Sequence, residues 1–107
     1  MIIIAVKDLF FSAKITETAS KLGKKAEFAT DDDELVRMAK KNPGLVIADL
    51  NAFSLSSLKM AKKEGLTIIG YLSHVQTDLR KRAEKICNEV ITQSELTKDL
   101  PQILSKY

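Results

Sequence analysis

The chain has 107 residues, of which 45% are hydrophobic, and its 17 basic and 14 acidic side chains give a net charge of +3. This length and composition predict a single globular domain, 1–107, with its own core, and they argue against a disordered chain. The charge is mixed and only weakly basic, which argues against a dedicated nucleic-acid binder.

The apolar runs reach only five or six residues, which is too short to cross a membrane. The first residues lack the basic start and long apolar stretch of a signal peptide, so we expect a cytoplasmic protein. The single cysteine, Cys87, excludes an internal disulfide, and with His74 as the lone histidine a zinc site is not expected. We expect Cys87 to be a small core residue.

Five short runs rich in Ile and Val predict buried parallel strands. The second run alternates polar and apolar residues, as an edge strand with one exposed face does. The runs lie at residues 2–6, about 25–29, 45–49, 67–72 and 89–92.

Segments with helical spacing of apolar residues lie between and after these runs. The last helix is expected to begin near Thr97 as its N-cap, with Pro101 in the first turn. The other predicted helices cover about 10–22, about 31–41, about 55–64 and about 76–86. Strict alternation of strand and helix predicts an α/β protein with one doubly wound parallel sheet and helices on both faces.

Polar residues directly follow four of the predicted strands. They are Lys7-Asp8, Asp49 with Asn51, Ser73-His74, and Gln93. Because the carboxyl ends of parallel strands meet at one edge of the sheet, these side chains are expected to line a common site.

These strand ends resemble those of the receiver domains of response regulators, and the resemblance covers almost the whole chain. Residues 45–51 resemble the third receiver strand with its phosphoacceptor aspartate, here Asp49. Residues 72–74 resemble the fourth strand, where Ser73 would contact the phosphoryl group, and residues 90–96 stand where receivers carry Lys-Pro. The resemblance implies the flavodoxin-like strand order 2-1-3-4-5.

In receivers, two acidic residues after the first strand hold Mg²⁺ together with the phosphoacceptor aspartate, and a lysine pairs with the phosphoryl oxygens. In this chain the positions of that acidic pair are occupied by Val6 and Lys7 or, with a shift of one residue, by Lys7 and Asp8. Gln93 replaces the lysine. A one-residue change of register decides whether Lys7 or Asp8 faces the site, and the sequence leaves this open.

These departures predict a pseudo-receiver that is not an enzyme and has no cofactor. Lys7 would repel Mg²⁺, and it could pair with Asp49 instead. The first alternative is a working receiver that is phosphorylated on Asp49, with Mg²⁺ held by Asp8 and Asp49. The second is a small-ligand binder at the same edge, although no Gly-rich phosphate loop follows the first strand.

We expect the chain to act by binding another signalling protein or by self-association, and not by binding a membrane or nucleic acid. The resemblance implies that the fourth helix, fifth strand and fifth helix form the interaction face. Its exposed charges would be those of Arg80, Arg82, Lys85, Glu89 and Lys98.

Three side chains near the predicted edge are ambiguous. His74 has no visible partner for acid–base chemistry or phosphorylation, so an ordinary surface or capping role is favoured. Phe10 and Phe11 are adjacent, and a helix rarely buries both of two adjacent side chains. One ring is therefore either exposed near Lys7 and Asp8 or packed under a neighbouring loop, and we favour the loop.

Overall fold

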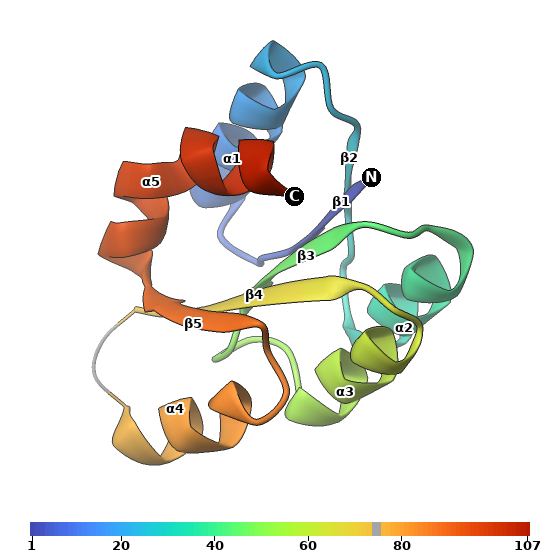
Figure 1. Cartoon of the computed structure of the whole chain (residues 1–107), viewed down its shortest axis with the longest axis vertical. Helices are drawn as coiled ribbons and strands as arrows, with labels where there is room; N and C mark the ends of the chain where they lie inside the picture. The colour runs from blue at the N-terminus through green and yellow to red at the C-terminus, as the bar shows by residue number, and fades with distance from the viewer. Residues whose placement is uncertain (74–75) are drawn as a thin grey trace.

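The computed structural model describes residues 1–73 and 76–107 and is built on a five-stranded parallel sheet (Figure 1). The strand order is β2-β1-β3-β4-β5, which confirms the predicted order and topology. The strands are β1 (Ile2–Ala5), β2 (Ala26–Phe28), β3 (Leu45–Asp49), β4 (Thr67–Leu72) and β5 (Glu89–Thr92).

Helices cover both faces of the sheet, as the alternation of strands and helices predicts (Figure 1). Side chains of α1 and α5 form one core with the sheet, and side chains of α2, α3 and α4 form the other. The helices are α1 (Leu9–Lys21), α2 (Asp32–Lys41), α3 (Leu55–Lys63), α4 (Thr77–Glu84) and α5 (Gln93–Lys106). Within the described residues, no helix is both long and apolar enough to cross a membrane.

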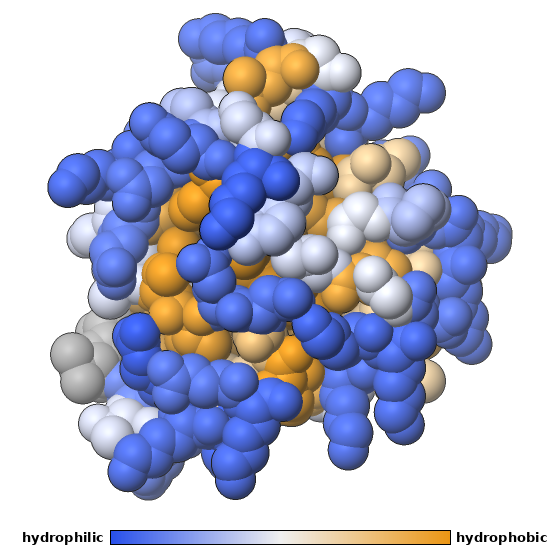
Figure 2. Space-filling view, viewed as in Figure 1, coloured by the Kyte–Doolittle hydropathy of each residue, from blue (hydrophilic) through white to orange (hydrophobic). Residues whose placement is uncertain are grey.

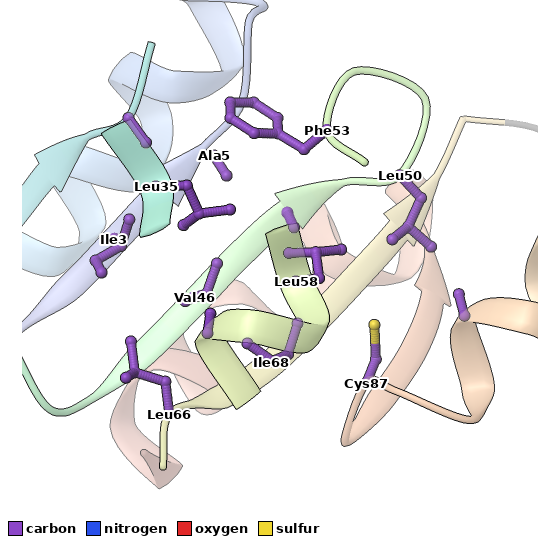
Figure 3. Packing of buried hydrophobic residues seen from close by; sticks show 14 of the residues in the cluster. Ile3, Ala5, Leu35, Val46, Leu50, Phe53, Leu58, Leu66, Ile68 and Cys87 are labelled. Atoms are coloured by element: carbon purple, nitrogen blue, oxygen red, sulfur yellow. The ribbon is translucent and has the colours of Figure 1, made fainter. Parts of the chain in front are cut away.

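The sheet separates two hydrophobic cores because successive side chains of a strand point to opposite faces. In β3, Val46 points into the core shared with α2 and α3, whereas Ile47 points into the core shared with α1 and α5. Leu35 of α2 and Leu58 of α3 are fully buried in the first core (Figure 3). Burying each such leucine contributes on the order of 2 kcal/mol. The carboxyl ends of the central strands are therefore held by packing on both faces.

The last helix begins earlier than the sequence analysis expects. Thr92 is its N-cap, and the Thr92 hydroxyl accepts a hydrogen bond from the Glu95 N–H at 3.1 Å. The Glu95 carboxylate accepts one in return from the Thr92 N–H at 3.1 Å, which completes a capping box. The expected start near Thr97 is wrong, and Pro101 lies in the interior of α5.

Other boundaries differ by a few residues. α4 ends at Glu84, before the expected 86, so Cys87 lies in the connection to β5 and not on the helix. Cys87 is nevertheless buried in the core on the α2–α4 side, as expected (Figure 3). α2 takes Asp31 as its N-cap, whose carboxylate accepts a hydrogen bond from the Glu34 N–H at 2.8 Å.

Candidate functional site

The sheet register brings the predicted site residues to one edge. Asp49, the last residue of β3, pairs in register with Tyr71 of β4, and Leu72 pairs with Thr92 at the end of β5. The residues that follow these strands therefore gather at the carboxyl edge, where parallel α/β sheets bind ligands. His74 lies outside the described residues.

Asp49 is half-buried at the end of β3, and its carboxylate is held by the turn that follows. Its Oδ1 accepts a hydrogen bond from the backbone N–H of Asn51 at 2.9 Å. The Asp49 carbonyl accepts the N–H groups of Ala52 and Phe53 at 3.1 and 3.0 Å. This Asx turn fixes the carboxylate at the carboxyl edge of the sheet and engages its Oδ1 in a hydrogen bond. Asn51 thus contributes its backbone, and its own side chain is exposed.

Asp8 caps the first helix. Its Oδ1 accepts hydrogen bonds from the backbone N–H groups of Phe10 and Phe11 at 3.0 and 3.2 Å. This use of a carboxylate at the positive end of α1 is a common structural role for aspartate.

The Lys7 side chain points to the α2–α4 side of the sheet, away from the α1–α5 core. Its Nζ lies 5.9 Å from the ring centroid of Phe53, and its charge helps to lower the pKa of Asp32. The ion pairs of the described residues do not include one between Lys7 and Asp49. The pairing of Lys7 with Asp49, which the sequence leaves possible, is therefore not formed. The physical reason is alternation along the chain, since Val6 packs into the α1–α5 core and Lys7 points away from it.

Tyr71 is a member of the site that the sequence analysis missed. Its side chain is 2% exposed and packs edge-on against Phe11, with ring centroids 5.3 Å apart. Burial raises the pKa of the Tyr71 hydroxyl well above its usual value, and the negative charges of Asp49 and Asp8 raise it further. Both carboxylates therefore act on one phenol on the α1–α5 side of the sheet. The available signal was its position two residues before Ser73, on the strand face that carries Asp49.

Asp32 links the second helix to the third, which the sequence analysis also missed. Its Oδ1 accepts hydrogen bonds from the Ser54 N–H and from the buried Ser57 hydroxyl, both at 3.0 Å. Partial burial raises the pKa of this carboxyl, but the hydrogen bonds from Ser54 and Ser57 and the charge of Lys7 outweigh it, so the pKa is lowered. Asp32 thus holds the start of α3, next to the loop that follows Asp49.

Ser73 follows β4 and Gln93 follows β5. Both border an open hollow on the side of β4 that faces away from Asp49. The hollow has a volume of about 470 Å³ and is also lined by Ser94, Thr97 and Lys98. Ser73 is exposed, and Gln93 is the first residue of α5. The side chain that follows β5 is thus a neutral amide, and the nearest ammonium lining this hollow is that of Lys98, one turn further along α5.

The carboxylates at this edge decide what metal it could hold. In the part of the chain that the structure describes, no group of three or more His, Cys, Asp or Glu side chains is placed to hold a metal ion. Asp8 and Asp49 are the two carboxylates that the sequence analysis names as possible ligands. Mg²⁺ is usually bound in proteins through one or two carboxylates plus waters and phosphates, so these two would be its ligands if it bound here.

The charged face of α4, β5 and α5 is partly as expected. Arg82, Lys85, Glu89 and Lys98 are exposed. Arg80 is not a free charge, because its guanidinium donates to the Val90 carbonyl at 2.9 Å and lies 3.5 Å from the Glu84 carboxylate. Arg80 therefore ties α4 to β5 and is half-buried.

The structure resolves the ambiguity of the two adjacent phenylalanines and also defines the state of Cys87. Phe11 is buried, whereas Phe10 is 92% exposed, so the favoured placement of the second ring under a loop is wrong. Phe11 and Ile15 occupy the inward face of α1, which leaves Phe10 on the outer face. Burial raises the pKa of the Cys87 thiol to about 11, which keeps it protonated and unreactive at neutral pH.

Solved receiver domains share this fold. The chain matches the receiver domain of a sensor histidine kinase from Pseudomonas aeruginosa at a TM-score of 0.80 and 15% identity, over 99% of this chain and 94% of that one. It matches a response regulator from Thermotoga maritima at a TM-score of 0.76 and 15% identity, over 97% and 96% of the two chains. It also matches a response regulator from Burkholderia pseudomallei at a TM-score of 0.77 and 14% identity, over 98% and 68%.

The Pseudomonas domain was solved with a magnesium ion in its active-site cleft, and the Burkholderia protein with a phosphorylated aspartic acid and a calcium ion. No protein-family model and no curated protein matches this chain. The chain therefore has the receiver fold, and identities of 14–15% carry the likeness no further than the fold.

Proposed function

We propose that this chain is a pseudo-receiver: a cytoplasmic signalling module that binds another protein or itself and performs no Mg²⁺-dependent phosphotransfer. The observation that carries the proposal is the composition of the edge after β1. Lys7 stands at a position where the receiver resemblance places an acidic residue, and Asp8, the one carboxylate there, is engaged as the cap of α1. A divalent metal beside Asp49 would have few carboxylates to hold it, and without the metal the negative charge of a phosphoryl group on Asp49 would be left uncompensated.

The replacement of a basic residue after β5 supports the same proposal. A receiver lysine pairs with phosphoryl oxygens as a point charge, which the neutral amide of Gln93 does not do. In such a module Asp49 would be a structural carboxylate that orders the turn through the Asn51 N–H. Exposed charges at Arg82, Lys85, Glu89 and Lys98 would then steer a protein partner.

A working receiver remains the second candidate, because the charges of Asp8 and Asp49 both act on the Tyr71 hydroxyl. Two carboxylates on one side of the sheet are within the one or two that Mg²⁺ usually uses in proteins. In this case Asp49 would accept the phosphoryl group, and the hydroxyl of Ser73 would contact it.

The two candidates are separated by a two-dimensional amide NMR titration with Mg²⁺, followed by beryllofluoride as a mimic of an aspartyl-bound phosphoryl group. The pseudo-receiver gives no saturable shifts at millimolar Mg²⁺. Saturable shifts at Asp8, Asp49, Asn51 and Ser73 that vanish in Asp49→Asn would establish the working receiver and overturn the proposal. Asp33→Asn, which changes an exposed carboxylate of α2, is the matched control.

A further inference from the structure

We propose that two copies of this chain associate about a two-fold axis through the α1–β2 patch, defined by Leu9, Phe10, Ala13 and Phe28. The patch lies where the start of α1 meets the end of the edge strand β2. The inference is independent of the proposed function, since such a dimer forms whether or not Asp49 accepts a phosphoryl group.

The patch concentrates exposed apolar side chains. Leu9 is 81% exposed, Phe10 92% and Phe28 48%. Among the described residues, the other large hydrophobic side chains with comparable exposure lie apart, at the end of α1, on α3 and at the C-terminal residue; they are Leu22, Met60 and Tyr107. Aromatic anchors of this kind dominate the binding energy of protein interfaces.

The face formed by α4, β5 and α5 lacks such anchors. No large hydrophobic side chain of α4 or β5 is among the exposed ones of the described residues. In Figure 2, hydrophilic side chains cover α4, and hydrophobic atoms show between α4 and α5 and also beside α3. Among the described residues, the most exposed large apolar side chains therefore lie at the α1–β2 patch, and not on this face.

A groove lies directly beside the exposed rings. It has a volume of about 270 Å³ and is lined mainly by apolar side chains, including Leu9, Ala13 and Phe28. An apolar cavity of roughly 150 Å³ already holds a benzene molecule, so the groove is large enough for one phenyl ring. Leu9 and Phe28 form its walls, and Phe10 lies outside it on the outer surface of α1.

A protruding ring next to a groove makes the patch complementary to itself. A two-fold axis places the same surface on both sides of the interface, so Phe10 of each copy enters the groove of the other. Each contact is then made twice. A partner with only a protruding side chain would leave Phe10 in water, which is why a second copy satisfies the patch better than such a partner does.

The charges around the patch also fit a second copy. Lys14 follows Phe10 by one helical turn and is exposed. Asp31 and Asp33, both exposed, come directly after the groove residues Ala29 and Thr30. The α1 side thus carries Lys14 beside the capping carboxylate of Asp8, and the β2 side carries Asp31 and Asp33. A two-fold axis can set Lys14 of one copy against the acidic pair of the other.

Sedimentation equilibrium of the whole chain tests the dimer. We expect the wild-type protein to approach twice the monomer mass as its concentration rises toward about 1 mM. Phe10→Ser removes the ring, and Ala13→Arg fills the groove; each is expected to raise the dimer dissociation constant at least tenfold, roughly the effect of losing an aromatic anchor. Both positions are exposed, so far-ultraviolet circular dichroism should be unchanged. Met60→Ser, at an exposed site on α3, is the control and should dimerise as the wild type does.

Mixing the two variants gives the decisive result. The Ala13→Arg protein still has the ring of Phe10, and the Phe10→Ser protein still has an open groove. Their mixture can form a heterodimer with one intact ring-in-groove contact, whereas neither variant alone can form any. We expect the mixture to associate more strongly than either variant separately. A wild-type chain that stays monomeric at about 1 mM, variants that dimerise normally, or a mixture without added association would each overturn the proposal.

Discussion

Tyr71 of β4 lies next to Asp49 of β3 in the sheet register, and the charge of the Asp49 carboxylate raises the pKa of the Tyr71 hydroxyl. A buried phenol thus lies beside the residue that matches the receiver phosphoacceptor. Its ring is held edge-on by Phe11 of α1, which is the residue that Asp8 caps. Burial and the charges of Asp49 and Asp8 therefore all act on the pKa of one hydroxyl, that of Tyr71.

This arrangement predicts a loss of stability at alkaline pH. The folded-state pKa of Tyr71 is raised above the ordinary value of 10.0, so its stabilising contribution is complete below pH 10.0 and declines as the pH rises above it. The reason is that the unfolded chain releases this proton first. We expect the free energy of unfolding to fall by up to about 1.4 kcal/mol per pH unit from this one group. Tyr71→Phe should flatten the decline.

Urea unfolding between about pH 8 and about pH 11 measures this effect. Tyr107→Phe is the matched control, because Tyr107 is the other tyrosine of the chain and is exposed. If the two variants show the same slope against pH, Tyr71 is not the group responsible.

A second prediction concerns the link between α2 and α3. Asp32→Asn removes the charge that receives the Ser54 N–H and the Ser57 hydroxyl, and we expect a loss of about 1–2 kcal/mol at neutral pH. The pKa of Asp32 is lowered in the folded state, so its contribution exists above the ordinary value of 3.8 and disappears as the pH falls through the lower folded value. The wild type and the variant should therefore converge in acid.

Chemical unfolding as a function of pH detects this convergence, with Asp33→Asn as the control because Asp33 lies in the same helical turn and is exposed. A constant difference between wild type and Asp32→Asn down to about pH 2 would contradict the assignment, since a protonated carboxyl no longer carries the charge that the variant removes.

A third prediction separates the two threonines near the start of α5. Thr92→Ala removes the hydroxyl that accepts the Glu95 N–H, and a lost N-cap costs about 1 kcal/mol. Thr97 lies within the helix, where its hydroxyl donates to the Gln93 carbonyl at 2.9 Å. Gln93 is the first residue of the helix, and helix geometry gives its carbonyl a backbone N–H partner as well, so Thr97→Ala should leave the stability nearly unchanged or raise it slightly. Thermal unfolding of both variants checks the order; a larger loss for Thr97→Ala would be inconsistent with the observed cap.

The strands of the sheet can be predicted from the sequence because each one is indicated by a short run of neighbouring residues. Runs such as residues 2–6 and 45–49 are too short for helices and rich in branched side chains, and they recur between helical segments. The start of α5 was misplaced although Thr92 and Glu95 have the spacing of a capping box, because Thr97 before Pro101 offered a competing start signal.

The site was less predictable because its contacts join residues far apart in the chain. Asp32 contacts Ser57 across 25 positions, and Tyr71 meets Asp49 and Asp8 only through the sheet register. The direction of Lys7 depends on one residue of register at the end of β1, which periodicity alone does not define. The position after a strand is enough to place Asp49 and Asp8 near this edge, whereas pairwise contacts require the fold.

The last prediction concerns Gly44, which precedes β3. It has φ of +144°, and a Cβ placed there would lie 2.1 Å from the Met1 carbonyl oxygen, a backbone atom that accepts the Leu45 N–H. Gly44→Ala must therefore both strain its own backbone and push β1 away from β3, and we expect a loss of roughly 3 kcal/mol or more. Gly65 also has a positive φ, +93°, but no atom lies within 4 Å of its added Cβ, so Gly65→Ala carries only the backbone strain of about 1–2 kcal/mol. Urea unfolding of the two variants compares them directly. Equal losses would show that the close approach of Met1 is relieved at no cost, and a larger loss for Gly44→Ala would establish that the start of β3 is held against the first residue of the chain.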